Sequence, residues 1–420
     1  MAVSWDLAVR AHDLCLQSEM SLKPADFLIF GGGIIGISIA LEAKRRFPDC
    51  RVTLLEKEPH CGLHASGRNS GVLHAGFYYS ADSLKARLTR QGNRRLTAYC
   101  RERGLRLNPC GKLVVATQPS ELEWLDELLR RAQRNGVELQ ALSAIEAREI
   151  EPRARVLERA LYSPTTSSID PAQVMTALVA DAVRLGIDIR TGLPWRGRDR
   201  DGVFTTAGRL PAGYVINAAG LQADRIAQDY GFGRRYRILP FKGLYLQARP
   251  GTPALHTHVY PVPDLDNPFL GVHHTVTVDG HSKIGPTAIP CLWREQYHGL
   301  ARFRAGEFLG IIARELSMLC GDDANFRRLA WEELRKYYRP TLVRQAARLL
   351  TDVIPADYTR RGRPGIRAQL LDVVNKRLEM DFVIEGDAHS FHILNVVSPG
   401  FTCAMPFAEL VLGEIEKRLP

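Results

Sequence analysis

A histidine in a glycine-containing run is the first residue in this sequence that could do chemistry. Residues 69–76 read NSGVLHAG, so His74 sits between Gly71 and Gly76, where the backbone can come close to a ligand. An imidazole titrates near neutral pH and can take a proton from a bound substrate. A second candidate is His273, at the end of an expected strand. Either histidine could be the base and the other an orienting donor, and a purely structural role is the alternative for both.

A phosphate-binding turn precedes this run. Residues 26–30 read DFLIF, which is typical of a buried parallel strand, and residues 31–36 read GGGIIG, which fits the pattern G-x-G-x-x-G. Gly31 permits the tight turn, Gly33 lets a pyrophosphate approach the backbone, and Gly36 allows close packing of the following helix on the strand. A glycine loop without a ligand would share this pattern, so the elements that follow decide between the two interpretations.

Those elements complete a nucleotide-binding unit. The periodicity predicts a helix over 34–46, and the N–H groups of Ile34 and Ile35 at its start favour a bound anion. A second strand over 52–55 leads to Glu56, at the spacing expected for an acid that accepts hydrogen bonds from ribose hydroxyls. Strand, turn, helix, strand and acid in this order predict an ADP-containing cofactor.

Composition limits the classes of function. The 420 residues are enough for two domains, or for one domain with a second one inserted, and the formal net charge is +10 at pH 7. The basic residues are spread along the chain and no nucleic-acid module is recognisable, so we expect anionic metabolites or an anionic membrane surface as partners, and no nucleic acid. The eight cysteines show no metal or redox spacing, which favours a reducing compartment.

The termini and apolar runs predict where the protein works. No run of eighteen apolar residues is present, and residues 1–24 lack the features of a secretory signal. We therefore expect a cytoplasmic protein that does not span a membrane. Peripheral contact with the inner face of a membrane stays open as an alternative, through the basic surface and the helical region 294–350.

The rest of the chain alternates between helical and strand patterns. Helices are expected over 83–103, 121–135 and 171–185, strands over 111–117, 160–162 and 214–220, and a mainly helical region over 294–350. Between 239 and 290 the pattern predicts an antiparallel sheet with strands at 242–247, 258–262, 269–274 and 283–286. Nucleotide-type elements flank this region, so the sheet belongs to an inserted domain.

Six stretches together resemble a known family. They are residues 30–36, 56–58, 69–79, 110–113, the pair 259–264 and 268–273, and the region from 365–369 through 392–395. In these stretches the chain resembles L-2-hydroxyglutarate dehydrogenases and oxidases, flavoproteins similar in fold to D-amino-acid oxidase and glycine oxidase. The sequence departs from the family pattern at Arg68, at 166–170 and around 398–403.

The resemblance implies an α/β fold, with a Rossmann-like FAD-binding domain and an inserted α+β substrate domain made of an antiparallel sheet and helices. The implied division is an N-terminal extension (1–24), a discontinuous FAD-binding domain (25–100, 160–235 and 362–420) and a substrate or cap domain (101–159 and 236–361). FAD is then bound without a covalent link. Its expected contacts are Gly31, Gly33, Ile34, Ile35, Gly36, Glu56, Lys57, Ser66, Asn69, Ser70, Gly71, Ala219, Gly220, Gly365, Gly400 and Thr402.

The implied reaction is oxidation of L-2-hydroxyglutarate, or a closely related 2-hydroxy acid, to 2-oxoglutarate by hydride transfer to flavin N5. A dicarboxylate needs a fixed donor at each end, and Lys242, Tyr260 and Arg367 are the candidates. An amine or amino-acid oxidase acting on glycine, sarcosine or an imino acid is the alternative on the same fold, and a flavin-binding protein without turnover is a third. The electron acceptor, oxygen or a quinone, leaves no pattern in the sequence.

Overall fold

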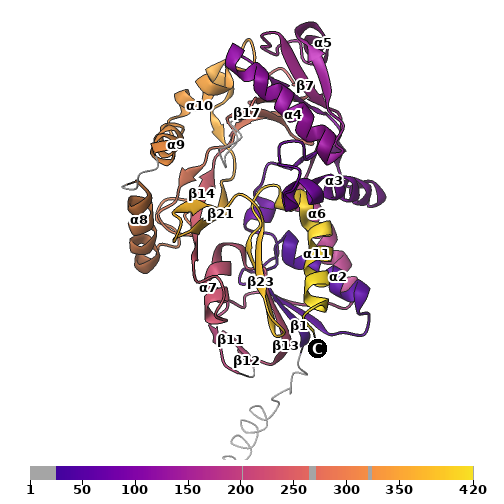
Figure 1. Ribbon diagram of the computed structural model, residues 1–420, viewed down its shortest axis with the longest axis vertical. Coiled ribbons are helices and arrows are strands. Elements are labelled where there is room, and N and C mark those ends of the chain that lie inside the picture. Colours follow the sequence, from indigo (N-terminus) through magenta and orange to yellow (C-terminus); the bar gives the residue numbers. More distant parts are fainter. Residues whose placement is uncertain (1–24, 201, 264–270, 320–323, 420) are drawn as a thin grey trace, which may run out of the picture.

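The computed structural model describes residues 25–200, 202–263, 271–319 and 324–419 (Figure 1). The predicted extension 1–24 and the beginning of the predicted strand 269–274 lie outside the described residues. The described chain forms several sheets of mixed α/β type, and two of them, with six and eight strands, organise the molecule. This arrangement agrees with the predicted fold class.

The six-stranded sheet has the order β23-β24-β13-β1-β2-β9. Its strands are β1 (Ala25–Phe30), β2 (Val52–Leu55), β9 (Asp188–Arg190), β13 (Ala212–Asn217), β23 (Val383–Gly386) and β24 (Ser390–Asn395). Five of them run parallel and β23 is an antiparallel edge. The strands predicted at 26–30, 52–55 and 214–220 are thus confirmed as neighbours in one parallel sheet.

Helices cover both faces of this sheet because successive side chains of a strand point to opposite sides. Phe27 and Ile29 of β1 pack against the helices α2 (Ile34–Arg46), α3 (Leu84–Glu102), α6 (Pro171–Arg184) and α11 (Gly400–Glu416). Leu28 and Phe30 pack against α7 (Ala223–Asp229) and the strands β11 (Val203–Thr205) and β12 (Gly208–Leu210). Figure 1 shows α2, α6 and α11 together on one side of the sheet and α7 on the other.

The eight-stranded sheet has the order β20-β15-β18-β17-β16-β5-β7-β6. Its strands are β5 (Lys112–Val115), β6 (Gln140–Ser143), β7 (Arg159–Ser163), β15 (Leu246–Gln247), β16 (His258–Pro261), β17 (His273–Val276), β18 (Ser282–Gly285) and β20 (Arg360–Arg361). All neighbouring pairs are antiparallel except β5 and β16, which run parallel. The expected antiparallel sheet is present, and the expected boundary at residue 160 falls inside β7. The domain boundaries stay a prediction.

One predicted strand is wrong. The pattern suggested a single strand over 242–247, but the chain divides it between two sheets. β14 (Tyr236–Gly243) pairs along its whole length with β21 (Gly365–Asp372), in a four-stranded sheet completed by β19 (Ile289–Pro290) and β22 (Arg377–Leu378). The chain leaves this pairing after Gly243 and enters the eight-stranded sheet at β15. Residues far away in the sequence supply the partners of each half, which a local pattern does not show.

The cap helices begin later than the sequence suggested. The region expected to be helical from 294 to 350 contains α8 (Ala305–Leu319), α9 (Ala324–Arg335) and α10 (Arg339–Ala346), and residues 294–304 form no long helix. α4 (Leu122–Asn135) ends at Gly136, whose φ of 60° is the left-handed value expected of a C-terminal glycine. α5 (Ala144–Ile150) follows. In the part of the chain that the structure describes, no helix has the length and apolarity required to cross a membrane.

The glycine turn after β1 is where two sheet strands and a helix come closest. A Cβ atom on Gly36 would lie 1.9 Å from the carbonyl oxygen of Gly31, and one on Gly31, whose φ is 111°, would lie 2.3 Å from that of Ala218. A Cβ on Gly33 would meet only the Ser66 hydroxyl oxygen, at 3.1 Å. The fold itself therefore requires Gly31 and Gly36, while the space beside Gly33 is free of protein backbone and is open to a ligand.

This difference between Gly36 and Gly33 predicts that valine at each position has a different effect. Gly36→Val should prevent α2 from packing on β1, and the protein should be lost to aggregation or show a strongly lowered melting temperature. Gly33→Val should keep its melting temperature without cofactor within a few degrees of wild type but no longer retain a dinucleotide. Thermal unfolding and the absorbance of the released cofactor check both. Equal loss of folding in the two variants would contradict this assignment.

Candidate cofactor and active site

A cavity of about 790 Å³ lies at the carboxyl ends of β1, β2 and β13 and extends to β14 and β21. This volume is within the usual range for sites that bind cofactors and small molecules. The cavity brings together residues from widely separated parts of the sequence. Of the predicted site residues, it is lined by Gly31, Gly33, Ile34, Ile35, Glu56, Lys57, Ser66, Asn69, Ser70, His74, Ala219, Gly220, Gly365, Arg367, Gly400 and Thr402.

Five predicted residues do not line the cavity. Gly36 and Gly71 are packed against protein backbone, as their missing Cβ atoms require. Lys242 lies between Phe241 and Gly243, which do line the cavity, and alternation along β14 turns its side chain to the opposite face. The other two, Tyr260 and His273, belong to the eight-stranded sheet.

The start of α2 offers an anion site at the cavity wall. The residue before the helix, Gly33, provides no side chain to cap it. The N–H group of Ile34 donates to the hydroxyl oxygen of Ser66 over 2.9 Å. The N–H groups of the first turn other than that of Ile34, together with the positive end of the helix dipole, favour a pyrophosphate here, with Ser66 as a further hydrogen-bonding group.

Glu56 is held in place by the backbone. Its two carboxylate oxygens accept hydrogen bonds from the N–H groups of Gly32 (2.8 Å) and Glu58 (2.9 Å), one on each oxygen. A carboxylate oxygen has a further lone pair, so both oxygens can also accept from a ribose diol. The side chain is buried and lines the cavity. This geometry fits the predicted role in binding the adenosine half of a dinucleotide.

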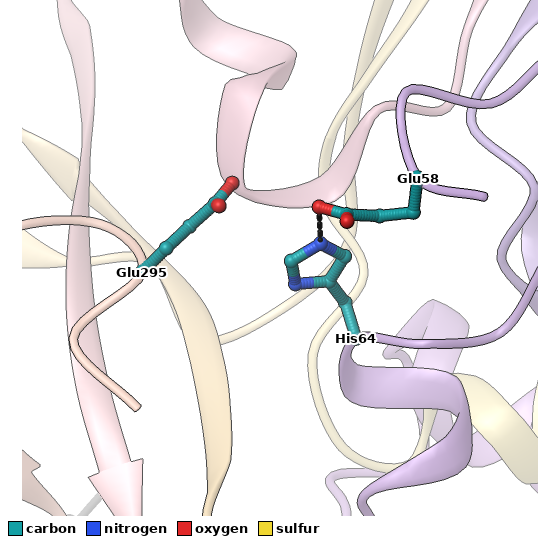
Figure 2. A group of neighbouring side chains, drawn as sticks. All are labelled: Glu58, His64 and Glu295. Atoms are coloured by element: carbon teal, nitrogen blue, oxygen red, sulfur yellow. Dashed lines mark hydrogen bonds and ion pairs between the residues drawn. The ribbon is translucent and has the colours of Figure 1, made fainter. Parts of the chain in front are cut away.

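An ion-pair network lines this end of the cavity, and Figure 2 shows three of its side chains, Glu58, His64 and Glu295. His64 Nε2 lies 2.9 Å from a carboxylate oxygen of Glu58, and Glu295 approaches from a distant part of the chain. These three side chains are close enough to hold a metal ion. However, Lys57 Nζ lies 2.5 Å from Glu58 and 2.7 Å from Glu295, and Arg302 donates to the second oxygen of Glu58 at 2.8 Å. Two protein cations already balance both carboxylates, so the network links the loop after β2 to residues 295–302 and leaves no need for a metal.

His74 is the predicted base candidate that reaches the cavity. Its side chain is buried, and Nδ1 has no hydrogen-bond partner among the described residues. Its backbone N–H donates to the hydroxyl of Thr402 at 3.3 Å. Burial, together with the charges of Lys112, His273 and Arg367, lowers the pKa of His74 well below 6.5. The imidazole is therefore neutral at physiological pH and can accept a proton.

His273 and Tyr260 lie behind the cavity wall, on one face of the eight-stranded sheet. Their rings stack, with centroids 3.7 Å apart and an interplanar angle of 16°. Nδ1 of His273 lies 2.7 Å from the carbonyl oxygen of Gly271, so this nitrogen carries the proton and donates it. His273 is thus fixed by its neighbours and orients the ring of Tyr260.

Strand pairing adds Lys112, His258 and Lys283 to this face, three basic residues that the sequence did not reveal as site candidates. Lys112 is opposite His258, and Lys283 is opposite Thr275, the second residue after His273. We call the residues Lys112, His258, Tyr260, His273 and Lys283 the basic face. Burial lowers the pKa of Lys112 to about 7 and that of Lys283 to about 8. The alternation His258-x-Tyr260 was visible in the sequence, but only the strand partners show that these residues meet.

Comparison with known proteins agrees with this geometry. The family model described as FAD dependent oxidoreductase matches residues 26–412. The human mitochondrial L-2-hydroxyglutarate dehydrogenase is 32% identical over 97% of this chain and 92% of its own length. An L-2-hydroxyglutarate dehydrogenase from Escherichia coli is 32% identical over 94% of each chain.

Solved structures share the fold. An L-alpha-glycerophosphate oxidase from Mycoplasma pneumoniae with FAD bound has a TM-score of 0.73 and 23% identity, over 94% of this chain and 95% of its own. Glycine oxidase from Geobacillus kaustophilus has a TM-score of 0.68 at the same identity and coverage. The glycine turn, Glu56 and the family match together show that the chain belongs to the FAD dependent oxidoreductase family, as a relative of the L-2-hydroxyglutarate dehydrogenases.

Proposed function

We propose that the protein oxidises L-2-hydroxyglutarate to 2-oxoglutarate. One observation carries the proposal: a single cavity joins the dinucleotide turn to a neutral, buried histidine and to the guanidinium of Arg367. The relatives named L-2-hydroxyglutarate dehydrogenase, which match almost the whole chain, support this choice of substrate. The structural neighbours that act on other substrates share the fold at 23% identity, and fold alone does not select a substrate.

The residues present fit FAD. The start of α2 and Gly33 would take the pyrophosphate, and Glu56 would take the ribose of the adenosine half. The segment from Ser66 to Ser70 lines the cavity between this end and His74, so it would follow the remainder of the cofactor. When bound, FAD supplies a two-electron acceptor for the hydride of a 2-hydroxy acid.

His74 and Arg367 divide the work on the substrate. His74, whose imidazole is neutral, takes the proton of the substrate hydroxyl. Arg367 on β21 lines the same cavity, and a guanidinium stays charged even where burial lowers its pKa. It binds the carboxylate beside the hydroxyl in a two-point contact and fixes the orientation of Cα. Burial of both groups excludes water from the reacting atoms.

Anaerobic reduction of the flavin tests the reaction. L-2-Hydroxyglutarate should bleach the oxidised flavin absorbance, and the D-enantiomer should not, because a fixed site presents one Cα–H direction to one flavin face. Lactate, glycine and sarcosine should react more slowly. Faster bleaching by glycine or sarcosine would move the function to an amine oxidase, and no bleaching by any of the five compounds would favour a flavoprotein without this turnover.

The assigned base is tested by His74→Ala. A general base contributes about 10²- to 10⁴-fold, so the rate of flavin reduction at saturating substrate should fall by this order while FAD stays bound. His281→Ala, an exposed histidine away from the cavity, is the matched control and should react at the wild-type rate. A His74→Ala protein that reduces its flavin normally but loses FAD easily would make His74 a cofactor-packing residue instead.

We also propose peripheral contact with an anionic lipid surface, from the cytoplasm. Large apolar side chains are exposed on and around α8 and α9, namely Leu300, Phe303, Leu309, Leu316, Leu319, Trp331, Leu334, Tyr337 and Tyr338. Exposed Arg327, Arg328 and Arg335 lie on α9 among them. An apolar patch with basic residues is typical of a surface that binds anionic lipid.

The described cysteines are free thiols, as expected in a reducing compartment.

Vesicle sedimentation tests this contact. The protein should sediment with vesicles that contain phosphatidylglycerol and stay in solution with phosphatidylcholine alone, because basic side chains are attracted to an anionic lipid surface. Trp331→Ser with Leu334→Ser should abolish sedimentation and leave flavin reduction in solution unchanged. The exposed pair Leu157→Ser with Val374→Ser, outside the patch, is the control. Equal binding of both double variants would contradict this surface.

A further inference from the structure

Lys112 occupies an environment that a lysine rarely tolerates. It begins β5, its side chain has no exposed surface, and Nζ has no hydrogen-bond partner among the described residues. Three aromatic rings surround the amine, with centroids 4.3 Å (Tyr260), 5.1 Å (Tyr78) and 5.6 Å (Phe77) from Nζ. Buried polar groups are almost always hydrogen-bonded, so a lysine that lacks such a bond needs an explanation.

A second buried hydrogen-bond donor near Lys112 also lacks an acceptor. The hydroxyl of Tyr78, whose ring helps to surround Lys112, is also buried without a partner among the described residues. The charged groups that act most strongly on neighbouring His74 are Lys112, His273 and Arg367, all of them basic. Lys112 Nζ and the Tyr78 hydroxyl therefore offer two hydrogen-bond donors that no described protein group accepts. An anionic ligand is the complementary partner.

We propose that Lys112, assisted by the Tyr78 hydroxyl, binds the second carboxylate of the substrate, the one remote from the oxidised carbon. This inference rests on the proposed function, because it assumes a dicarboxylate held at His74. Lys112 and Arg367 both act electrostatically on His74, so a five-carbon dicarboxylate whose hydroxyl meets His74 has one cationic group for each carboxylate. Arg367 takes the carboxylate next to the hydroxyl, and Lys112 takes the other.

The chemistry of the buried amine suits this role. Burial lowers the pKa of Lys112 to about 7, so the charged and neutral forms are nearly balanced near neutral pH, and an arriving carboxylate stabilises the charged form. The lysine stem is flexible and its head is a compact point charge, so it can turn out of the ring cage toward His74. A role restricted to cation–π packing in the cage is the competing explanation.

Ligands that are not oxidised separate these explanations. Glutarate and pentanoate have the same chain length, and only glutarate has the second carboxylate. Binding of each to the oxidised FAD-loaded enzyme is followed through the perturbation of the flavin absorbance. Wild-type protein should bind glutarate at least about tenfold more tightly than pentanoate, because a charge-assisted hydrogen bond discriminates by about this factor or more. Equal affinity for the two acids would overturn the proposal without any variant.

The variant test uses Lys112→Met, which keeps the length of the side chain but removes the amine. It should weaken glutarate binding by about 10- to 100-fold and change pentanoate binding by less than about twofold. Lys85→Met is the matched control, since Lys85 is buried and donates instead to the carbonyl of Met380. This control should keep the wild-type preference for glutarate.

Two results would overturn the assignment: unchanged glutarate binding in Lys112→Met, or an equal loss for both acids, which a structural role predicts. Should Lys112→Met fail to fold, Lys112→Arg provides the test, because it retains the charge and should retain the preference for glutarate. Failure of the proposed reaction is seen separately, since glutarate carries no hydroxyl to oxidise. An enzyme that prefers glutarate but is not reduced by L-2-hydroxyglutarate would contradict the reaction and not the carboxylate site.

Discussion

The whole site depends on backbone contact between the ends of two parallel strands. The N–H group of Ala218, just after β13, donates to the carbonyl of Phe30 at the end of β1, and the next residue, Gly31, has no room for a side chain against Ala218. Both strands end at the same edge of the sheet, so both following turns face the cavity. Without this approach, neither the start of α2 nor Glu56 would border one continuous space.

The eight-stranded sheet lies behind the cavity wall and has a different character. One face of it collects basic side chains, and burial lowers the pKa of His258, His273, Lys112 and Lys283. Burial disfavours the charged form of each of these groups, and a bound anion would stabilise that form. The parallel sheet thus carries the glycine turn and the acid that suit a dinucleotide, and in our proposal Arg367 and Lys112 of the basic face serve the anionic substrate.

The secondary structure of the nucleotide-binding part could be predicted from the sequence. Each of its signals is local: the glycine spacing around Gly33, the apolar period of α2, and the distance to Glu56. The substrate part could not be predicted in this way, because its contacts come from strand partners far apart in the chain. Lys242 looked suitable as an isolated cation but faces away from the cavity, and Lys112 was hidden because its neighbour His258 lies 146 positions further along the sequence.

The ion-pair network around Glu58 is a similar case. Its members Lys57 and His64 follow the predicted acid directly, yet Arg302 and Glu295 come from a region that the sequence suggested to be helical. A salt-bridged loop has no hydrophobic period to reveal it. Long-range ion pairs of this kind are determined by the tertiary structure, and only the assembled fold shows which charges meet.

The pH dependence of flavin reduction tests the central claim most directly, namely that His74 acts as a neutral buried base. The quantity to measure is the rate of anaerobic reduction by L-2-hydroxyglutarate divided by its dissociation constant, which reports ionisations of the free enzyme. A pKa lowered well below 6.5 means that His74 has already lost its proton at neutral pH. The account therefore predicts no increase of this ratio between about pH 7 and 9, where loss of the Lys112 proton lowers it, and a further decrease in the acidic range where His74 becomes protonated. A ratio that rises steadily through this interval would show that a group of higher pKa is the base, and would contradict the assignment of His74.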